Sequence, residues 1–146
     1  MKKVCVLFWH NIDHRDTKLP YGIEKAVNSI KVAGFSEVRM LSYQKFINVP
    51  DFVIQVDAAI VMAKERFLAL YESGKKQFPV KVRAGMSQHL AHSPVICLLS
   101  DWIRFKYAGT LTHALCDCVC VIDADTLWVK AWTSRGFMGF AFASCV

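Results

Sequence analysis

Residues 119–128 read VCVIDADTLW, in which four apolar residues precede two aspartates and a second apolar run. The first apolar run is typical of a strand that is covered on both faces, as in the parallel sheets of α/β proteins. Strands of that kind present ligand-binding groups at their carboxyl ends. We therefore predict a buried strand that ends at a binding site.

The two aspartates of this stretch, Asp123 and Asp125, are separated by one residue. On an extended backbone, residues two apart point to the same side. Their carboxylates are therefore predicted to hold a hard divalent cation that also binds phosphate oxygens. The alternative is a strand followed by an aspartate-rich turn, because aspartate is common in turns.

A strand–helix–strand unit is predicted at the start of the chain. Residues 3–9 and 38–41 are rich in β-branched and aromatic residues, which favour strands. Between them, Pro20 suits the first turn of a helix and Gly34 its end. The apolar residues that recur at helical spacing are Ile23, Ala26, Val27, Ile30 and Ala33. Such a unit builds parallel sheets, so we expect an α/β fold with a right-handed crossover.

Three further elements are predicted before the aspartates. Residues 52–56 form a short strand, residues 58–71 a helix closed by Gly74, and residues 94–107 a helix that begins near a proline. Residues 108–118 then connect to the strand at residue 119. On the helix, Asp101 and Arg104 are three residues apart and can form an ion pair.

A chain of 146 residues with 54% hydrophobic and 21% charged residues is expected to form a single soluble domain. No apolar run approaches the roughly 20 residues that span a bilayer. Lys2 and Lys3 precede a short apolar run without a cleavage site, so we expect a strand rather than a signal peptide. The six cysteines are then expected to be thiols in a reducing compartment, which predicts a cytoplasmic protein.

The formal net charge is +6, and residues 73–100 contain no acidic residue. The basic residues that gather there are Lys75, Lys76, Lys81 and Arg83. This segment could meet the phosphates of nucleic acid, an anionic membrane surface or an acidic small molecule. The alternative is a solvated basic loop or short helix.

Cysteines and histidines offer other candidate metal ligands. Cys116, Cys118 and Cys120 alternate, which on a strand places three thiols on one face, and His113 is near them in sequence. Structural zinc sites usually space their cysteines differently, so buried thiols are favoured over a zinc site.

The histidine pairs do not form a zinc-hydrolase motif. His10 and His14 are four apart, but Asn11 stands where the glutamate would be. His89 and His92 are three apart and fall in the same basic segment. The chain also lacks the nucleophile-elbow, dinucleotide and phosphate-loop motifs, which excludes the commonest readings as a serine hydrolase or a nucleotide-cofactor enzyme.

Four motifs occur together in the chain: FWHN at 8–11, SDWIR at 100–104, DADT at 123–126 and LWVKAW at 127–132. This combination resembles the DxD-containing glycosyltransferases of the GT-A fold, especially the group related to capsular polysaccharide and α-1,4-glycosyl transferases. The similarity covers residues 4–132. It implies one GT-A-like, Rossmann-like domain with a mostly parallel sheet flanked by helices.

The resemblance also implies a function, the transfer of a sugar from a nucleotide-diphosphate donor, UDP- or GDP-linked, to a hydroxyl of a glycan or other acceptor. Mn²⁺ or Mg²⁺ would bridge the diphosphate, and no nucleic acid would take part. Such a cation stabilises the negative charge that develops on the departing diphosphate.

Residue roles follow from the same resemblance. Asp125 would bind the metal most directly, while Asp123 would contact the metal, its bound water or the ribose. Asp101 and Arg104 would contact the donor sugar and form the catalytic part of the site. The loop that would hold the nucleotide consists of Phe8, Trp9, His10 and Asn11.

Relatives of this kind carry an acceptor-binding half after the DxD motif, whereas only a short tail follows Asp125 here. We therefore expect the acceptor part to be short or missing. A second hypothesis is a small basic non-catalytic subunit on a degenerate GT-A scaffold that binds a protein or nucleic-acid partner. A third is a cysteine-ligated metal protein.

Overall fold

A computed structural model describes residues 2–11, 15–77, 94–112 and 116–129. Within these ranges four parallel strands form one sheet in the order β3-β2-β1-β4. The strands are β1 (Lys3–Phe8), β2 (Glu37–Ser42), β3 (Val53–Asp57) and β4 (Cys118–Val121). The predicted α/β class with a parallel sheet is confirmed, and the arrangement is Rossmann-like.

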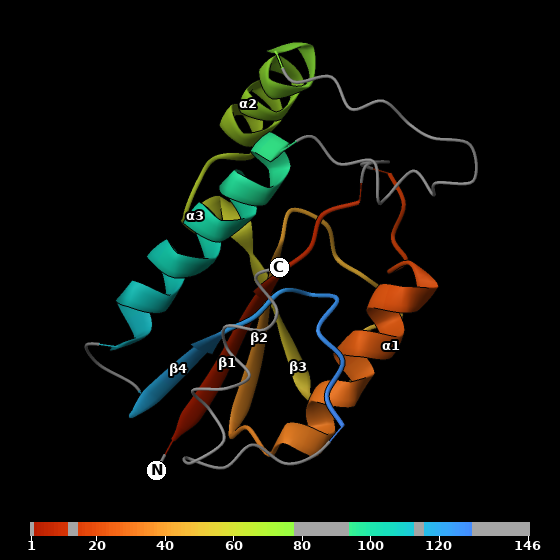
Figure 1. Ribbon diagram of the computed structural model, residues 1–146, viewed down its shortest axis with the longest axis vertical. Helices are drawn as coiled ribbons and strands as arrows, with labels where there is room; N and C mark the ends of the chain where they lie inside the picture. The colour runs from red at the N-terminus through yellow and green to blue at the C-terminus, as the bar shows by residue number, and fades with distance from the viewer. Residues whose placement is uncertain (1, 12–14, 78–93, 113–115, 130–146) are drawn as a thin grey trace.

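Three α-helices flank the sheet, with α1 on one face and α2 and α3 on the other (Figure 1). They are α1 (Tyr21–Ser29), α2 (Lys64–Gln77) and α3 (Pro94–Thr112). Two short 3-10 helices, η1 (Ile30–Ala33) and η2 (Ala58–Ile60), follow α1 and β3. None of the helices in the described ranges combines the length and the apolar character of a membrane span.

The strand–helix–strand unit predicted at the start of the chain is confirmed. α1 begins after Pro20 and continues into η1, which ends at Gly34 with a φ of 76°. This left-handed conformation favours glycine and stops the helix where the sequence indicated. Ile23 and Val27 of α1 pack with Leu7 of β1 in the core on this face.

The opposite face of the sheet is covered by α2 and α3. Successive side chains of β1 alternate between the two faces, so Val6 and Phe8 point toward the helices that follow β3. They pack with Phe67 of α2 and with Ile103 and Tyr107 of α3. Because both faces are covered, β1 is buried along almost its whole length, as its apolar sequence predicted.

The prediction that Gly74 ends a helix begun at Ala58 is wrong. η2 covers the start of that segment, and α2 runs from Lys64 through Gly74 to Gln77. A Cβ atom at Gly74 would lie 2.5 Å from the Cβ of Val95, so glycine at this position allows α2 and α3 to approach closely. Glycine is therefore required at this position by the packing of α3 against α2, and not by the end of a helix.

The observed bounds of two other elements differ from the predicted ones. α3 continues to Thr112, beyond the expected end at residue 107, because Tyr107, Ala108 and Leu111 are all buried on one side of the helix. The predicted strand at residues 52–56 is found one residue later, at Val53–Asp57.

The three alternating cysteines do not share a face, contrary to the prediction. Cys116 precedes β4 and packs in the core beside α3, whereas Cys120 packs in the core beside α1. Cys120 stands opposite Cys5 of β1 in the sheet register, and both are buried. Burial raises the pKa of the Cys5 thiol well above its usual value and raises the pKa of Cys120 to about 12. All five cysteines in the described ranges are free thiols.

Candidate functional site

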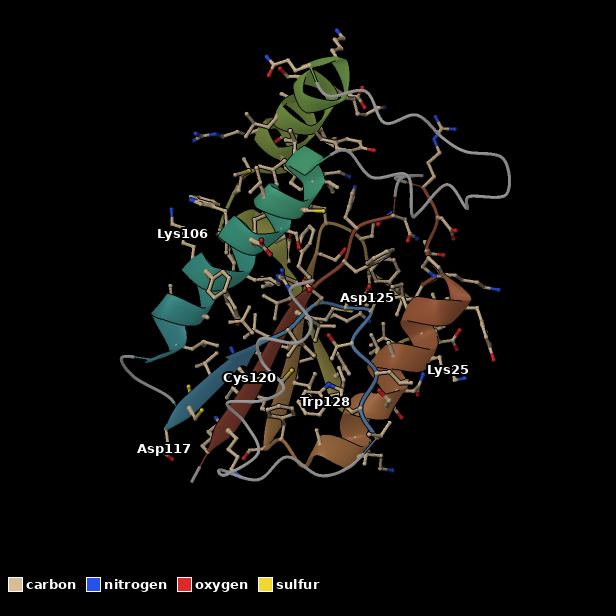
Figure 2. The ribbon with its side chains drawn as sticks, in the orientation of Figure 1. Lys25, Lys106, Asp117, Cys120, Asp125 and Trp128 are labelled. Atoms are coloured by element: carbon tan, nitrogen blue, oxygen red, sulfur yellow. The ribbon has the colours of Figure 1, made fainter. Side chains whose placement is uncertain are left out.

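The order of the strands defines one special position at the carboxyl edge of the sheet. From β1 the chain moves outward to β2 and β3, and then returns to the other side of β1 to form β4. Open α/β sheets bind ligands where the direction of winding reverses in this way. β1 and β4 both end at this switch point, and the segments that follow them begin there. Figure 2 places Asp125 at the same edge.

Arg104 joins the predicted SDWIR and DADT motifs in space. Its side chain is 5% exposed and reaches from α3 to the segment after β4. Nη1 lies 2.6 Å from Oδ1 of Asp123 and donates to the carbonyl oxygen of Ile122 at 2.5 Å. Nη2 donates to Oδ1 of Asp101, which confirms the ion pair predicted on the helix.

The Arg104 guanidinium is buried and forms its hydrogen bonds and ion pairs with other groups of the protein. A buried charge requires partners, and Arg104 finds two carboxylates and the Ile122 carbonyl, with a longer bond from Nε to the carbonyl of Ser100. We therefore interpret it as a positioning residue that fixes Asp123. The direct contact with a donor sugar expected for Arg104 stays a prediction.

Charge at the site remains negative despite Arg104. The side chains of Asp101 and Asp123 are 51% and 34% exposed, and Asp125 is exposed. Three carboxylates against one guanidinium leave two formal negative charges. The site is thus suited to a cation.

The backbone at the two aspartates is a turn and not a strand, so the prediction of an extended backbone is wrong. β4 ends at Val121, and the amide of Thr126 donates to the carbonyl of Asp123 at 3.1 Å. Ala124 is 6% exposed and packs in the core beside α1, which bends the chain between the two carboxylates. The aspartate-rich turn considered as the alternative is what forms, at the predicted end of the strand.

Carboxylates are the type of ligand that a hard divalent cation takes. Mg²⁺ is commonly bound through one or two carboxylates together with substrate phosphates, and Asp123 and Asp125 supply two. Within the described ranges no group of three His, Cys, Asp or Glu side chains is placed to hold a metal ion. The described thiols therefore do not form the closed four-ligand set that structural zinc uses.

Two of the residues predicted to hold a nucleotide belong to an aromatic cluster. Phe8 and His10 are both buried, and the His10 ring lies edge-on to Tyr43 and Phe67, with centroids 5.7 and 5.3 Å away. Tyr43 donates to the carbonyl of Met62 at 2.8 Å. Burial, with a contribution from the Asp57 carboxylate, raises the pKa of Tyr43 to about 12. These rings pack against Phe67 and so form part of the core between the sheet and α2.

Asn11 serves the loop between β1 and α1. Its Oδ1 accepts a bond from Nε1 of Trp9 at 2.7 Å, and its Nδ2 donates to the carbonyl of Lys18 at 2.7 Å and to that of Asp16 at 3.3 Å. The side-chain amide is used internally. FWHN reaches the switch point, but its role toward a nucleotide stays a prediction.

Cys97 belongs to the site, although the sequence did not single it out. It is exposed, one helical turn before Asp101. Burial of part of the thiol raises its pKa, the Asp101 and Asp123 carboxylates raise it further, and the Arg104 guanidinium lowers it. The spacing of 97, 101 and 104 is that of one helix face, which is the signal that could have found it.

Several predicted residues lie outside the described ranges: His14, Lys81, Arg83, His89, His92, His113 and Trp132. Lys75 and Lys76 lie in the last turn of α2. Comparison of the chain with models of protein families, with curated proteins and with solved structures finds no match. A function is therefore inferred from the residues and their geometry.

Proposed function

We propose that this protein is a metal-dependent glycosyltransferase, which moves a sugar from a nucleotide-diphosphate donor to an acceptor hydroxyl. The observation that carries the proposal is the bridge from Arg104 to Asp123 at the sheet's switch point. It holds one carboxylate, beside the exposed Asp125, where open α/β sheets bind nucleotides.

The start of α1 supports the same placement. α1 follows β1, so its first turn lies at the carboxyl edge of the sheet, and none of the side chains that the structure describes caps it. Backbone N–H groups at the start of a helix favour phosphate. A diphosphate between this turn and the aspartates would meet N–H donors on one side and carboxylates on the other.

The charge of the site sets the requirement for a cation. A diphosphate brought against an excess of carboxylates is repelled, so Asp123 and Asp125 favour donor binding only when a divalent cation lies between them and the phosphates. When bound, Mg²⁺ or Mn²⁺ supplies Lewis-acid stabilisation of the leaving diphosphate. Arg104 holds Asp123 in place through their 2.6 Å contact, and Asp125 is the carboxylate most accessible to the cation.

The direct test is thermal unfolding with UDP- and GDP-sugars, each with and without MnCl₂. A ligand present at about 100 times its Kd stabilises the folded state by about 2.7 kcal/mol, so we expect the melting temperature to rise by several degrees. The rise should require both donor and Mn²⁺.

Asp125→Ala should abolish this rise while leaving the melting temperature of the free protein nearly unchanged, because Asp125 is exposed. The matched control is Asp51→Ala, an exposed aspartate that precedes β3 at the opposite edge of the sheet. No rise with any donor, or an equal rise in Asp125→Ala, would contradict the proposal.

A second candidate is a non-catalytic scaffold that binds a protein or nucleic-acid partner. It is favoured by the internal use of Arg104, which can serve stability alone. It predicts partner binding that neither Asp125→Ala nor a chelator changes, and no donor-dependent rise. A steep loss of binding with salt would separate a phosphate-bearing partner from an apolar one.

A further inference from the structure

The outer side of α3 carries a row of exposed apolar residues. Leu98, Trp102 and Phe105 are 67%, 46% and 63% exposed, although Ile103 of the same helix is fully buried. Their spacing of four and then three residues places them on one side of the helix. We call them the α3 stripe; in the described part of the chain it is left exposed to solvent.

Basic groups flank the α3 stripe. Nζ of Lys106 lies 4.5 Å from the ring centroid of Trp102, and Figure 2 shows Lys106 on the side of α3 that faces away from the sheet. Lys75 and Lys76 lie in the last turn of α2, next to Gly74, which packs against Val95 one turn before Leu98; Lys75 is paired with Glu72 at 3.3 Å. Asp101, which precedes Trp102 in the sequence, is paired with Arg104. An anionic partner would therefore meet, beside Trp102, an acid that already has a cationic partner.

These features fit the surface of an anionic membrane. Trp, Phe and Leu enter the boundary between headgroups and acyl chains, while lysines remain among the anionic headgroups. A second copy of the chain is disfavoured because each copy has a net charge of +6 and would bring its Lys106 to the shared contact. Nucleic acid is disfavoured as well, because its phosphates would contact the lysines but would not bury the exposed apolar side chains of the stripe.

We propose that the α3 stripe, with Lys106 and the basic end of α2, docks this protein on an anionic lipid bilayer. Only side chains enter the membrane, because α3 itself stays packed on the sheet through Ile103 and Tyr107. The docking does not depend on the glycosyltransferase proposal. It would, however, bring the adjacent Cys97–Asp101 side of α3 close to the membrane surface.

Co-sedimentation of the full chain with vesicles tests this proposal. One set contains phosphatidylcholine alone, and the other also contains phosphatidylserine. We expect binding to the second set, and quenching of Trp102 fluorescence by brominated lipids that Trp102→Phe removes. Phe105→Ser should weaken binding about tenfold through lost apolar burial, and Lys106→Gln about fivefold.

The matched control is Ile60→Ser, because Ile60 is 66% exposed but lies in η2, outside the stripe. It should bind vesicles as the unchanged protein does. Trp102→Phe, Phe105→Ser and Lys106→Gln all replace exposed side chains, and circular dichroism verifies that the three variants fold.

Three results would overturn the proposal. One is no binding to either vesicle set. Another is binding that Phe105→Ser and Ile60→Ser weaken equally. The third is a dimer in light scattering that Phe105→Ser dissociates, which would assign the stripe to a second copy.

Discussion

The segments that follow β1 and β4 meet at one edge of the sheet but use their polar groups differently. After β1, the Asn11 amide is hydrogen-bonded to its own loop and His10 is enclosed by aromatic rings. After β4, Asp123 is paired with the buried guanidinium of Arg104, which also pairs with Asp101, and Asp125 is exposed. One segment is closed on itself, and the other keeps excess negative charge at the surface.

This difference separates stability from ligand binding. Polar groups that are satisfied within the protein hold the backbone in place, whereas uncompensated carboxylates near solvent are available to a cation. Substitutions after β1 should therefore lower the free energy of unfolding and spare cation binding. Substitutions at Asp125 should have the opposite pattern.

The largest effect is expected for Phe8→Ala. Phe8 is 4% exposed and packs against Phe67, so its truncation should lower the free energy of unfolding by about 4 kcal/mol. Urea denaturation measures this change, and Phe8→Leu should cost less than about 1.5 kcal/mol. The folded fraction should retain its Mn²⁺- and donor-dependent stabilisation; selective loss of that response in Phe8→Leu would place Phe8 in the site.

Arg104→Met should lower the free energy of unfolding by about 3 kcal/mol, because it leaves Asp123 and the Ile122 carbonyl without a cationic donor. Adding Asp123→Asn should recover part of this loss by removing an unpaired charge. Urea denaturation of the single and double variants tests the coupling. Strict additivity of the two changes would contradict the assigned bridge.

Asn11→Ala should lower the free energy of unfolding by about 2 kcal/mol, because it leaves the Trp9 indole and the Lys18 carbonyl without their partner. Asn11→Asp is the informative control, since it keeps an acceptor for Trp9 and loses the donor to Lys18. Its loss should be intermediate. If Asn11→Ala instead removed donor binding without loss of stability, the segment after β1 would be part of the site.

The smallest effect concerns the pH dependence of Cys97. Because burial and two carboxylates raise its pKa, its thiolate forms at higher pH than that of an ordinary thiol, and its alkylation by iodoacetamide should lag accordingly. Asp101→Asn removes one of these negative charges. The pKa should fall, and alkylation below that pKa should become about twofold faster, a modest gain because solvent screens the pair.

Mass spectrometry of the Cys97 peptide across a pH series measures this rate, with Asp51→Asn as the control. An unchanged pH profile in Asp101→Asn would show that the carboxylate does not act on the thiol.

The sequence predicted those parts of the fold whose signals are local. β1, α1 and the stop at Gly34 follow from β-branched residues, helical spacing and one left-handed glycine. The role of Gly74 could not be predicted in this way, because its reason is Val95 on another helix. The sequence did offer an aspartate-rich turn at Asp125 as an alternative, but the packing of Ala124 beside α1 is a tertiary contact that it does not show.

The candidate site was predicted as a set of residues rather than as an arrangement. Asp101 and Asp123 are far apart in sequence, and only the burial of Arg104 between them shows how they meet. Cys97 was missed because an isolated cysteine carries no motif. Phe8 and Asn11 matched a motif, yet their contacts are with the aromatic cluster and the loop, which sequence alone does not reveal.

The pairing of Cys5 with Cys120 across β1 and β4 has a consequence for measuring motion in this protein. Both thiols are buried in the core beneath α1, and burial raises the pKa of each, so a thiol reagent can modify them only after this face of the core opens. Ala124, between the two site aspartates, packs in the same core. The labelling rate of these two cysteines therefore reports how often the α1 face opens, and a ligand that holds the turn at Ala124 in place should slow that rate.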